Sequence, residues 1–202
     1  MGNSKPAWQR QQYRRNVETR ELRKSFLIVC EGEKTEPQYF KGFRVNTNVV
    51  NIKIEGIGYN TQSLVNEAIS LKEGKDYDQV WCVFDRDSFP AQNFNAAFEI
   101  AASNDIRIAY SKEAFELWYL LHFQYYDSTI KRKEYYEMLT KLLNHKYEKN
   151  SDTIYDDLLN FQSDAIRNAK RLLSSYTPCK PERDNPSTTV HELVEELNKY
   201  VV

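Results

Sequence analysis

Residues 26–40 decide the fold, and they read FLIVCEGEKTEPQYF. Five apolar residues lead into Glu31, Gly32 and Glu33, and a helical pattern begins shortly afterwards, at residue 35. An apolar run bounded by glycine and charge is typical of a buried strand in a parallel sheet. Such a strand delivers Glu31 to the carboxyl edge of the sheet, where open α/β sheets build their sites. Gly32 is a candidate supporting residue in this turn.

A second apolar run with an acidic end occurs at residues 80–87, which read VWCVFDRD. Side chains two residues apart on a strand point the same way, so Asp85 and Asp87 can share a face. We expect them to converge with Glu31 at one edge of the sheet. Acidic residues at strand ends are also common as caps and turn formers, and the pair alone would favour that role. Its combination with Glu31-Gly32 favours a site.

Three carboxylates in one crevice repel one another unless a hard cation neutralises them. Mg²⁺, or Mn²⁺ in its place, prefers oxygen ligands and keeps waters that substrate phosphates can replace. A site of this kind can activate a water for in-line attack on a phosphodiester. The sequence therefore predicts a metal site at Glu31, Asp85 and Asp87.

The pattern of strands and helices predicts an α/β fold with a compact parallel four-stranded sheet flanked by helices. Strands are predicted at 25–30, 49–55, 79–84 and 106–110, and helices at 35–45, 61–72 and 94–102. Four further helices are expected at 113–123, 131–143, 156–174 and about 186–200. The last would begin with Asn185 as N-cap and Pro186 in the first turn, or alternatively at Thr189, which has capping-box spacing to Glu192. The expected organisation is a basic arm at 1–24, a core at 25–112 and a helical extension at 113–202 packed on the core.

The 202-residue chain has a net charge of −1, so no global attraction to nucleic acid is expected. Its three cysteines fit no metal or disulfide spacing, and it has neither a signal-peptide pattern nor an apolar run long enough to span a membrane. We therefore expect a cytoplasmic protein with no membrane partner. Residues 1–24 are basic, and they are either a solvated tail or an arm that reaches a phosphate backbone. The candidate nucleic-acid contacts are Arg14, Arg15, Arg20, Lys34 and Arg86.

Other candidates lie at or beyond the fourth strand. Ser111 and Lys112 would reach the same edge of the sheet, where Lys112 could bind a phosphate or stabilise its developing charge. Glu116 lies in an apolar helix and needs a partner, either the acidic cluster or Arg86. His122, further along the same helix, is more often a buried histidine than a catalyst.

These motifs resemble the Toprim domain, which is shared by topoisomerases, bacterial primases, OLD-family nucleases and small ribonucleases. More closely, the chain is similar to the RloB family, Toprim-like proteins found near restriction-modification and other antiphage loci. The segments that carry the resemblance are LIVCEGEKTEPQYF at 27–40, FDRD at 84–87, FELWYLLHF at 115–123 and NPSTTVHELVEEL at 185–197.

The resemblance implies a metal-dependent nuclease of bacterial antiphage defence, with RNA such as tRNA as the favoured substrate and DNA as the alternative. It implies Glu31 as general base or acid, and Asp85 and Asp87 as the metal-binding pair. Glu36 stands one residue away from a second acidic position of the OLD-type motif, and it would be a further metal ligand. A partner protein from a defence system is also implied.

A second hypothesis is a non-catalytic module that binds a partner protein or a nucleotide. Exposed aromatic residues would favour it, because tyrosine and tryptophan dominate interface hot spots. Aromatic residues beside basic ones can also stack on single-stranded bases, so burial of the cluster is the discriminating observation. The candidates for such a patch are Tyr119, Tyr125, Tyr126, Tyr135 and Tyr136. Nucleotidyl transfer is less favoured, because the sequence has neither a P-loop nor a primase zinc motif.

Overall fold

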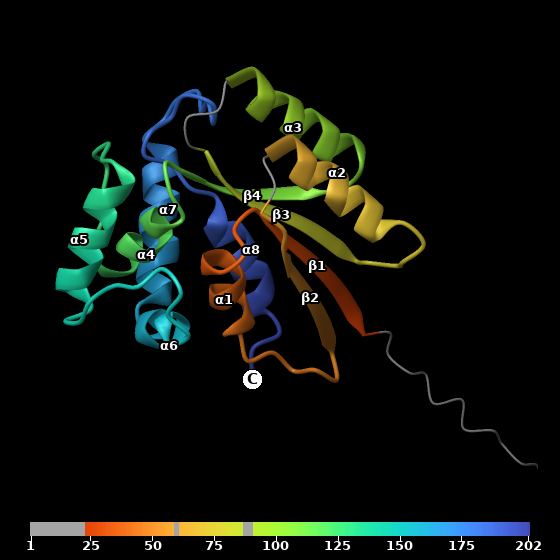
Figure 1. The fold of residues 1–202 in the computed structure, drawn as a ribbon, viewed down its shortest axis with the longest axis horizontal. Coiled ribbons are helices and arrows are strands. Elements are labelled where there is room, and N and C mark those ends of the chain that lie inside the picture. The colour runs from red at the N-terminus through yellow and green to blue at the C-terminus, as the bar shows by residue number, and fades with distance from the viewer. Residues whose placement is uncertain (1–22, 59–60, 87–90) are drawn as a thin grey trace, which may run out of the picture.

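The computed structural model describes residues 23–58, 61–86 and 91–202, and these form an α/β fold (Figure 1). A four-stranded sheet with the strand order β2-β1-β3-β4 lies at its centre, and each pair of neighbouring strands is parallel. The predicted fold class is confirmed. The strands are β1 (Lys24–Cys30), β2 (Val50–Gly56), β3 (Gln79–Arg86) and β4 (Arg107–Lys112).

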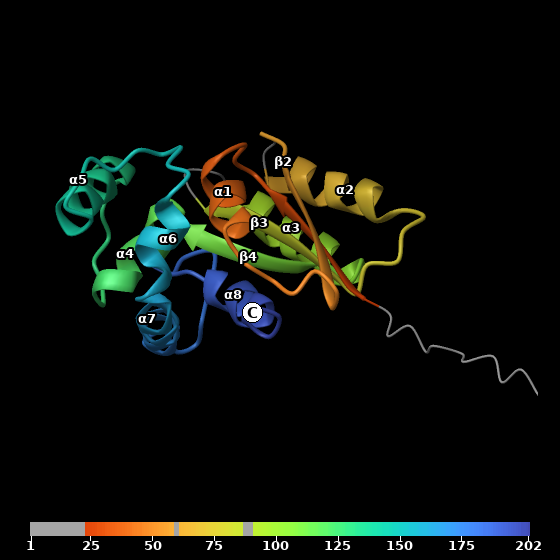
Figure 2. The ribbon, with the colours of Figure 1, turned by 90° about the horizontal axis from the view of Figure 1, so that it is seen from below.

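Helices cover both faces of this sheet (Figures 1 and 2). The helices between the strands are α1 (Thr35–Lys41), α2 (Thr61–Lys72) and α3 (Ala91–Ser103). After β4 the structure describes α4 (Glu116–Phe123), α5 (Arg132–Leu142), α6 (Ile154–Leu159), α7 (Gln162–Ser174) and α8 (Val190–Asn198). Helices α2 and α3 pack on one face, whereas α1, α4 and α8 lie on the other.

Strand β1 is buried on both faces, as its unbroken apolar sequence predicts. Its alternate side chains enter two separate cores. Phe26 and Ile28 pack with the helical half of the chain, and Leu27 and Val29 pack with α2 and α3. Because all four side chains are 0% exposed, β1 is the central element that joins the two layers.

Several of the predicted helix boundaries are wrong, including the start of the helix predicted at 94–102, which begins at Ala91. The helix predicted at 35–45 ends at Lys41, where Gly42 lies against the ring of Tyr155. The helix predicted at 113–123 starts at Glu116, because Glu113 adopts a positive φ of 69° and donates its amide to the carbonyl of Arg86. The single helix predicted at 156–174 is two helices, α6 and α7, which are separated near Phe161.

The last helix also begins later than Pro186 predicts. Helix α8 starts at Val190 with Thr189 in the N-cap position, which was the alternative start, but the Thr189 hydroxyl accepts the amide of Tyr110 instead of capping the helix. Residues 187–189 run beside the end of β4. There Lys112 donates its amide to Ser187, and Thr189 donates to Tyr110. These bonds cover part of the edge of β4, which would otherwise be open to pairing with another chain.

The C-terminal residues pack against the first two strands. The ring of Tyr200 meets that of Phe26 edge-on, with 5.6 Å between the ring centroids. Its carbonyl accepts the amide of Asn46 at 2.7 Å, and Val201 pairs with Val45 in an isolated antiparallel bridge. The two ends of the described chain are therefore joined in one core.

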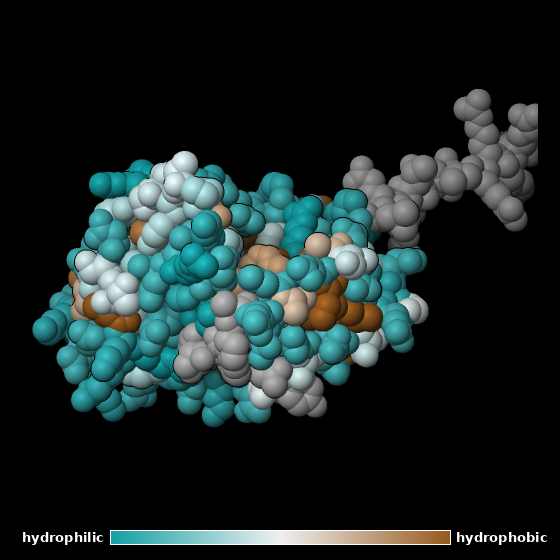
Figure 3. Space-filling view, turned by 90° about the horizontal axis from the view of Figure 1, so that it is seen from above, coloured by the Kyte–Doolittle hydropathy of each residue, from teal (hydrophilic) through white to brown (hydrophobic). Residues whose placement is uncertain are grey.

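Within the described ranges, no helix combines the length and apolarity needed to cross a membrane. Hydrophilic side chains, shown in teal, cover most of the face seen in Figure 3, and hydrophobic ones form separate patches among them.

Gly56, the last residue of β2, lies where two backbone segments meet. A Cβ atom added there would lie 2.6 Å from the carbonyl oxygen of Gly32 and 2.9 Å from the Cα atom of Glu33. We expect Gly56→Ala to lower the free energy of unfolding by about 1–3 kcal/mol, because overpacking against backbone forces a shift. Urea denaturation measures this change, and Asn51→Ala, on an exposed position of the same strand, is the control. Equal urea midpoints for the two variants would contradict the prediction.

Candidate active site

The ends of β1 and β3 meet as the sequence predicts. The backbone amide of Asp85 donates a hydrogen bond to Oε2 of Glu31 at 3.0 Å. Glu31 is itself held at the backbone, because its amide donates to Val83 and its carbonyl accepts the amide of Gly58. Two strand ends that are 54 residues apart in the chain are thus joined through one carboxylate.

Asp85 has a largely buried carboxylate whose two oxygens differ in their contacts. Its Oδ2 atom lies 3.1 Å from Nη2 of Arg132, and the same nitrogen donates to the carbonyl of Glu113 at 3.0 Å. Its Oδ1 atom is buried and has no hydrogen-bond partner within the described residues. Burial raises the pKa of Asp85 well above its usual range, and the charges of Glu36, Glu116 and Glu31 raise it further, whereas Arg132 lowers it.

Glu36, in the first turn of α1, is 4% exposed and belongs to the same cluster. Burial raises its pKa, and Glu116 adds to this rise, whereas Lys149 and the backbone amide of Gly32 oppose it. Gly32 leaves the space that this carboxylate occupies, since a Cβ atom at Gly32 would lie 2.1 Å from Oε2 of Glu36. The predicted supporting role of Gly32 therefore has a physical basis in the position of Glu36.

Glu116, the first residue of α4, is 1% exposed and accepts a hydrogen bond from the hydroxyl of Tyr147 at 2.9 Å. Of the two environments that the sequence left open for it, the acidic cluster is the one observed, because Glu116 raises the pKa of both Asp85 and Glu36. Arg86 lies on the opposite face of β3, where its guanidinium lies 5.3 Å from the ring centroid of Phe94.

Lys112 reaches the predicted edge of the sheet on the face opposite Asp85. It pairs in register with Arg86, and its ammonium group donates to the carbonyl of Glu182 at 3.3 Å. Burial lowers the pKa of Lys112, and the nearby Arg86 lowers it further. Both cations are largely buried on this opposite face, so they do not form part of the acidic cluster.

Ser111 and His122 have structural contacts in this fold. Ser111 lies beside Asp85 in the sheet register, but its hydroxyl is buried against that of Thr188 at 2.9 Å. His122 is buried, and its Nδ1 atom lies 2.9 Å from the carbonyl oxygen of Trp118. Burial lowers the pKa of His122 to about 4, so this ring is neutral at pH 7 and belongs to the aromatic core.

Four predicted site residues, Asp87, Arg14, Arg15 and Arg20, lie outside the described residues. Lys34 is exposed in the turn before α1. In the proposed aromatic patch, Tyr119 and Tyr135 are 0% exposed, and the other three tyrosines are half-buried.

The donor set of the acidic cluster suits a hard cation. Every ligand it offers is a carboxylate oxygen, and the buried Oδ1 atom of Asp85 lacks a hydrogen bond within the described part of the chain. The described side chains alone do not form a complete site, because no group of three or more His, Cys, Asp and Glu residues among them is arranged to hold a metal ion. Among the described residues, Asp85 would hold one, with Glu31 and Glu36 beside it.

Sequence reasoning missed two residues of this site, Arg132 and Tyr147. Arg132 stands in a charged run, Lys131 to Glu134, that looks like the solvated start of a helix. Tyr147 lies in a polar loop after α5 and is one of many tyrosines in this chain. No local pattern marks either residue, because both reach the carboxylates only through the folding of the helical half onto the sheet.

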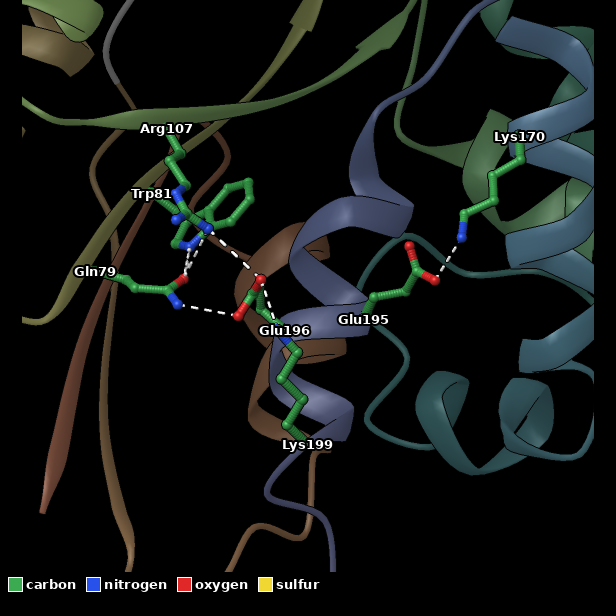
Figure 4. A network of polar contacts seen from close by, with 7 residues as sticks. All are labelled: Gln79, Trp81, Arg107, Lys170, Glu195, Glu196 and Lys199. Atoms are coloured by element: carbon green, nitrogen blue, oxygen red, sulfur yellow. Dashed lines mark hydrogen bonds and ion pairs between the residues drawn. The ribbon is translucent and has the colours of Figure 1, made fainter. Parts of the chain in front are cut away.

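A second polar cluster lies at the other end of the sheet, next to a cavity of about 660 Å³ (Figure 4). Glu196 of α8 accepts a hydrogen bond from Gln79 at 3.0 Å and pairs with Lys199 at 2.8 Å. Arg107 lies 3.6 Å from the same carboxylate and over the ring of Trp81. The contacts of Lys199, Gln79 and Arg107 lower the pKa of Glu196. Because the polar groups of this cluster pair with one another, they hold α8 against the sheet.

The fold and its acidic edge define an α/β protein whose first and third strands bring carboxylates together. The chain belongs to the RloB-like protein family, whose model matches residues 26–197. The family resemblance predicted from the sequence is therefore confirmed. No curated protein and no solved structure matches the chain.

Proposed function

We propose that this protein is a nuclease that depends on Mg²⁺ or Mn²⁺ and acts in bacterial antiphage defence, with RNA such as tRNA as the favoured substrate and DNA as the alternative. The observation that carries the proposal is the partly buried cluster at the strand ends, where the amide of Asp85 donates a hydrogen bond to Glu31 and where Glu36 and Glu116 add like charge. A cluster of this kind is costly to keep charged without a cation.

The residues of the cluster would have separate roles. Asp85 would hold the cation together with Asp87, and Glu36 would add to the negative charge around it. Glu31, oriented by the amide of Asp85, would accept or return a proton at its carboxylate as general base or acid. The cation would supply Lewis-acid activation of a water and of a phosphoryl oxygen.

The biological context and the substrate class rest on family membership and on the Toprim resemblance of the motifs. The match to the RloB-like family model includes both strand ends, which carry Glu31 and Asp85. Lys112 and Arg86 lie at the same edge of the sheet but on its other face, where both side chains are largely buried, so the proposal does not rest on them. A defence-system partner protein belongs to the same proposal.

The alternative function, a module that binds a partner protein or a nucleotide, keeps only part of the aromatic patch that favoured it, because Tyr125, Tyr126 and Tyr136 are half-buried. Interface hot spots need displayed aromatic side chains. Tyr119 and Tyr135 are fully buried in the core of the helical half, so they stabilise the fold and cannot contact a partner.

The proposal is tested by cleavage of labelled tRNA, single-stranded RNA and plasmid DNA with Mg²⁺, Mn²⁺ or EDTA. Glu31→Gln is the variant, because glutamine keeps an oxygen that can accept the amide of Asp85 and removes the charge. Glu33→Gln is the matched control, since Glu33 is exposed in the same turn. Cutting that requires metal, persists in the control and is lost in Glu31→Gln supports the proposal. No cutting of any substrate with either metal overturns it.

A further inference from the structure

We propose that the groove beside α5 binds a single-stranded segment of nucleic acid next to the acidic cluster, with a base against Tyr136 and phosphates at Lys133 and Lys141. The inference deepens the proposed function, because it assigns a binding site for the strand that flanks the reacting phosphodiester. Its test is separate from that function, since binding can be measured without cleavage.

The groove has a volume of about 480 Å³. Two tyrosine rings form its apolar wall, and three lysines surround it. The tyrosines are Tyr136 and Tyr147, and the lysines are Lys133, Lys141 and Lys146. The remaining lining residues are Glu137 and Thr140, so three positive charges face one negative charge.

Helix geometry explains why these groups gather. Lys133, Tyr136, Thr140 and Lys141 are spaced at i, i+3, i+7 and i+8, which places them on one face of α5. Tyr147 then folds back over this face, and its ring centroid lies 5.4 Å from that of Tyr136. The result is a paired aromatic surface with an ammonium group toward each end of the helix face.

Tyr147 links the groove to the acidic cluster. The hydroxyl of Tyr147 donates to Glu116, which is one of the clustered carboxylates. At the start of α5, Arg132 contacts Asp85, and the next residue, Lys133, lines the groove. A nucleic-acid strand with one phosphodiester at Asp85 would therefore continue onto α5.

The lysine charges around the groove favour nucleic acid over an apolar peptide as the occupant. Lys133 and Lys141 are exposed and take part in none of the ion pairs of the described residues, so their charges are available to phosphates. Aromatic rings beside such charges are the arrangement that holds single strands without base readout, because every base has a π-face. Lys146 contributes less, since it pairs with Glu148 at 3.3 Å.

The first test measures the binding of fluorescein-labelled oligouridine to the full chain in EDTA by fluorescence anisotropy. Tyr136→Leu removes the ring and keeps an apolar side chain, and we expect about tenfold weaker binding, as for the loss of one stacked base. Tyr136→Phe keeps the ring and should bind within about twofold of the unmodified protein. Circular dichroism melting of both variants separates a loss of stacking from a loss of fold.

The second test measures how the affinity depends on salt. Each lost phosphate contact with a single strand lowers the slope of log K against log salt by about 0.7. We expect that reduction for Lys133→Ala and for Lys141→Ala. Lys75→Ala is the matched control, because Lys75 is an exposed lysine in the loop before β3, and its slope should equal that of the unmodified protein.

Affinity and salt slope unchanged by Tyr136→Leu, Lys133→Ala and Lys141→Ala would overturn the groove assignment while leaving the proposed nuclease intact. Failure of the unmodified protein to bind oligouridine, together with metal-dependent cleavage, would do the same. Binding that these three variants weaken, without cleavage under any metal condition, would support the groove and overturn the nuclease.

Discussion

Asp85→Asn is expected to lower metal-dependent cleavage by about 100-fold or more and to raise the melting temperature of the protein. The loss of activity follows from the proposed role of Asp85 as a metal ligand, since a metal stabilises the transition state substantially and about 1.4 kcal/mol corresponds to tenfold in rate. The gain in stability follows from the burial of this carboxylate among Glu31, Glu36 and Glu116. Activity and stability should therefore change in opposite directions.

The raised pKa of Asp85 determines how the stability of the protein should change with pH. Because burial raises the pKa of Asp85 in the folded state, the folded protein binds more protons than the unfolded chain above about pH 4. The free energy of unfolding then falls as the pH rises from about 4 through the raised pKa. Asparagine has no such titration, so Asp85→Asn should gain stability over the unmodified protein increasingly from pH 4 to pH 8.

Thermal melting in EDTA across that pH range measures the difference. A change of about 1 kcal/mol corresponds to about 2–4 °C in a chain of this length. Asp78→Asn is a control for which we expect the opposite change in stability. A hydrogen bond from Lys24 lowers the pKa of Asp78, so loss of this carboxylate should reduce the stability of the protein at neutral pH. A lower melting temperature for Asp85→Asn at every pH would show that the carboxylate is satisfied in the folded state.

Arg132→Ala is expected to destabilise the protein in EDTA and to make it depend on Mn²⁺ for stability. Arg132 lowers the pKa of Asp85 and contacts its Oδ2 atom, so its loss leaves the acidic cluster with less positive charge. The side chain of Arg132 is 38% exposed, and water screens the pair, so the expected cost is about 1–2 kcal/mol, below that of a buried pair.

The informative measurement for Arg132→Ala is the shift in melting temperature between EDTA and Mn²⁺. A cation that binds only the folded state stabilises it by mass action. The shift should be larger in the variant than in the unmodified protein, because Mn²⁺ would replace the missing charge. Arg44→Ala removes an exposed ion pair to Asp156 and should show an unchanged Mn²⁺ shift. An equal shift in all three proteins would argue against a cation at Asp85.

The sheet could be predicted from the sequence because its strands carry strong local signals. The apolar runs that end at Cys30 and at Phe84 could be buried only between two layers of helices. The break between α6 and α7 had no such signal, because their residues continue one helical pattern through Asn160 and Phe161. Pro186 misled the prediction of α8, since the backbone at 187–189 pairs with β4 instead of entering a helix.

At the site, the sequence predicted the meeting of Glu31 and Asp85 because both lie at the ends of parallel strands. That Arg86 lies on the face opposite Asp85 also follows from the pleat of β3, which places adjacent residues on opposite faces of the sheet. Arg132 could not be predicted, because its contact with Asp85 spans 47 residues and depends on how α5 docks. Roles that depend on strand order were therefore predictable, and roles that depend on helix docking were not.

The contact between Phe26 and Tyr200 has a consequence for biosynthesis. Phe26 and the Tyr200 ring that covers it are separated by most of the described sequence, so Phe26 is made well before Tyr200. At about 5–20 residues per second, the interval between them lasts roughly 9–35 seconds. During this time the ring of Phe26 lacks the aromatic contact that Tyr200 makes with it. The packing of Phe26 should therefore be completed only after translation has passed Tyr200.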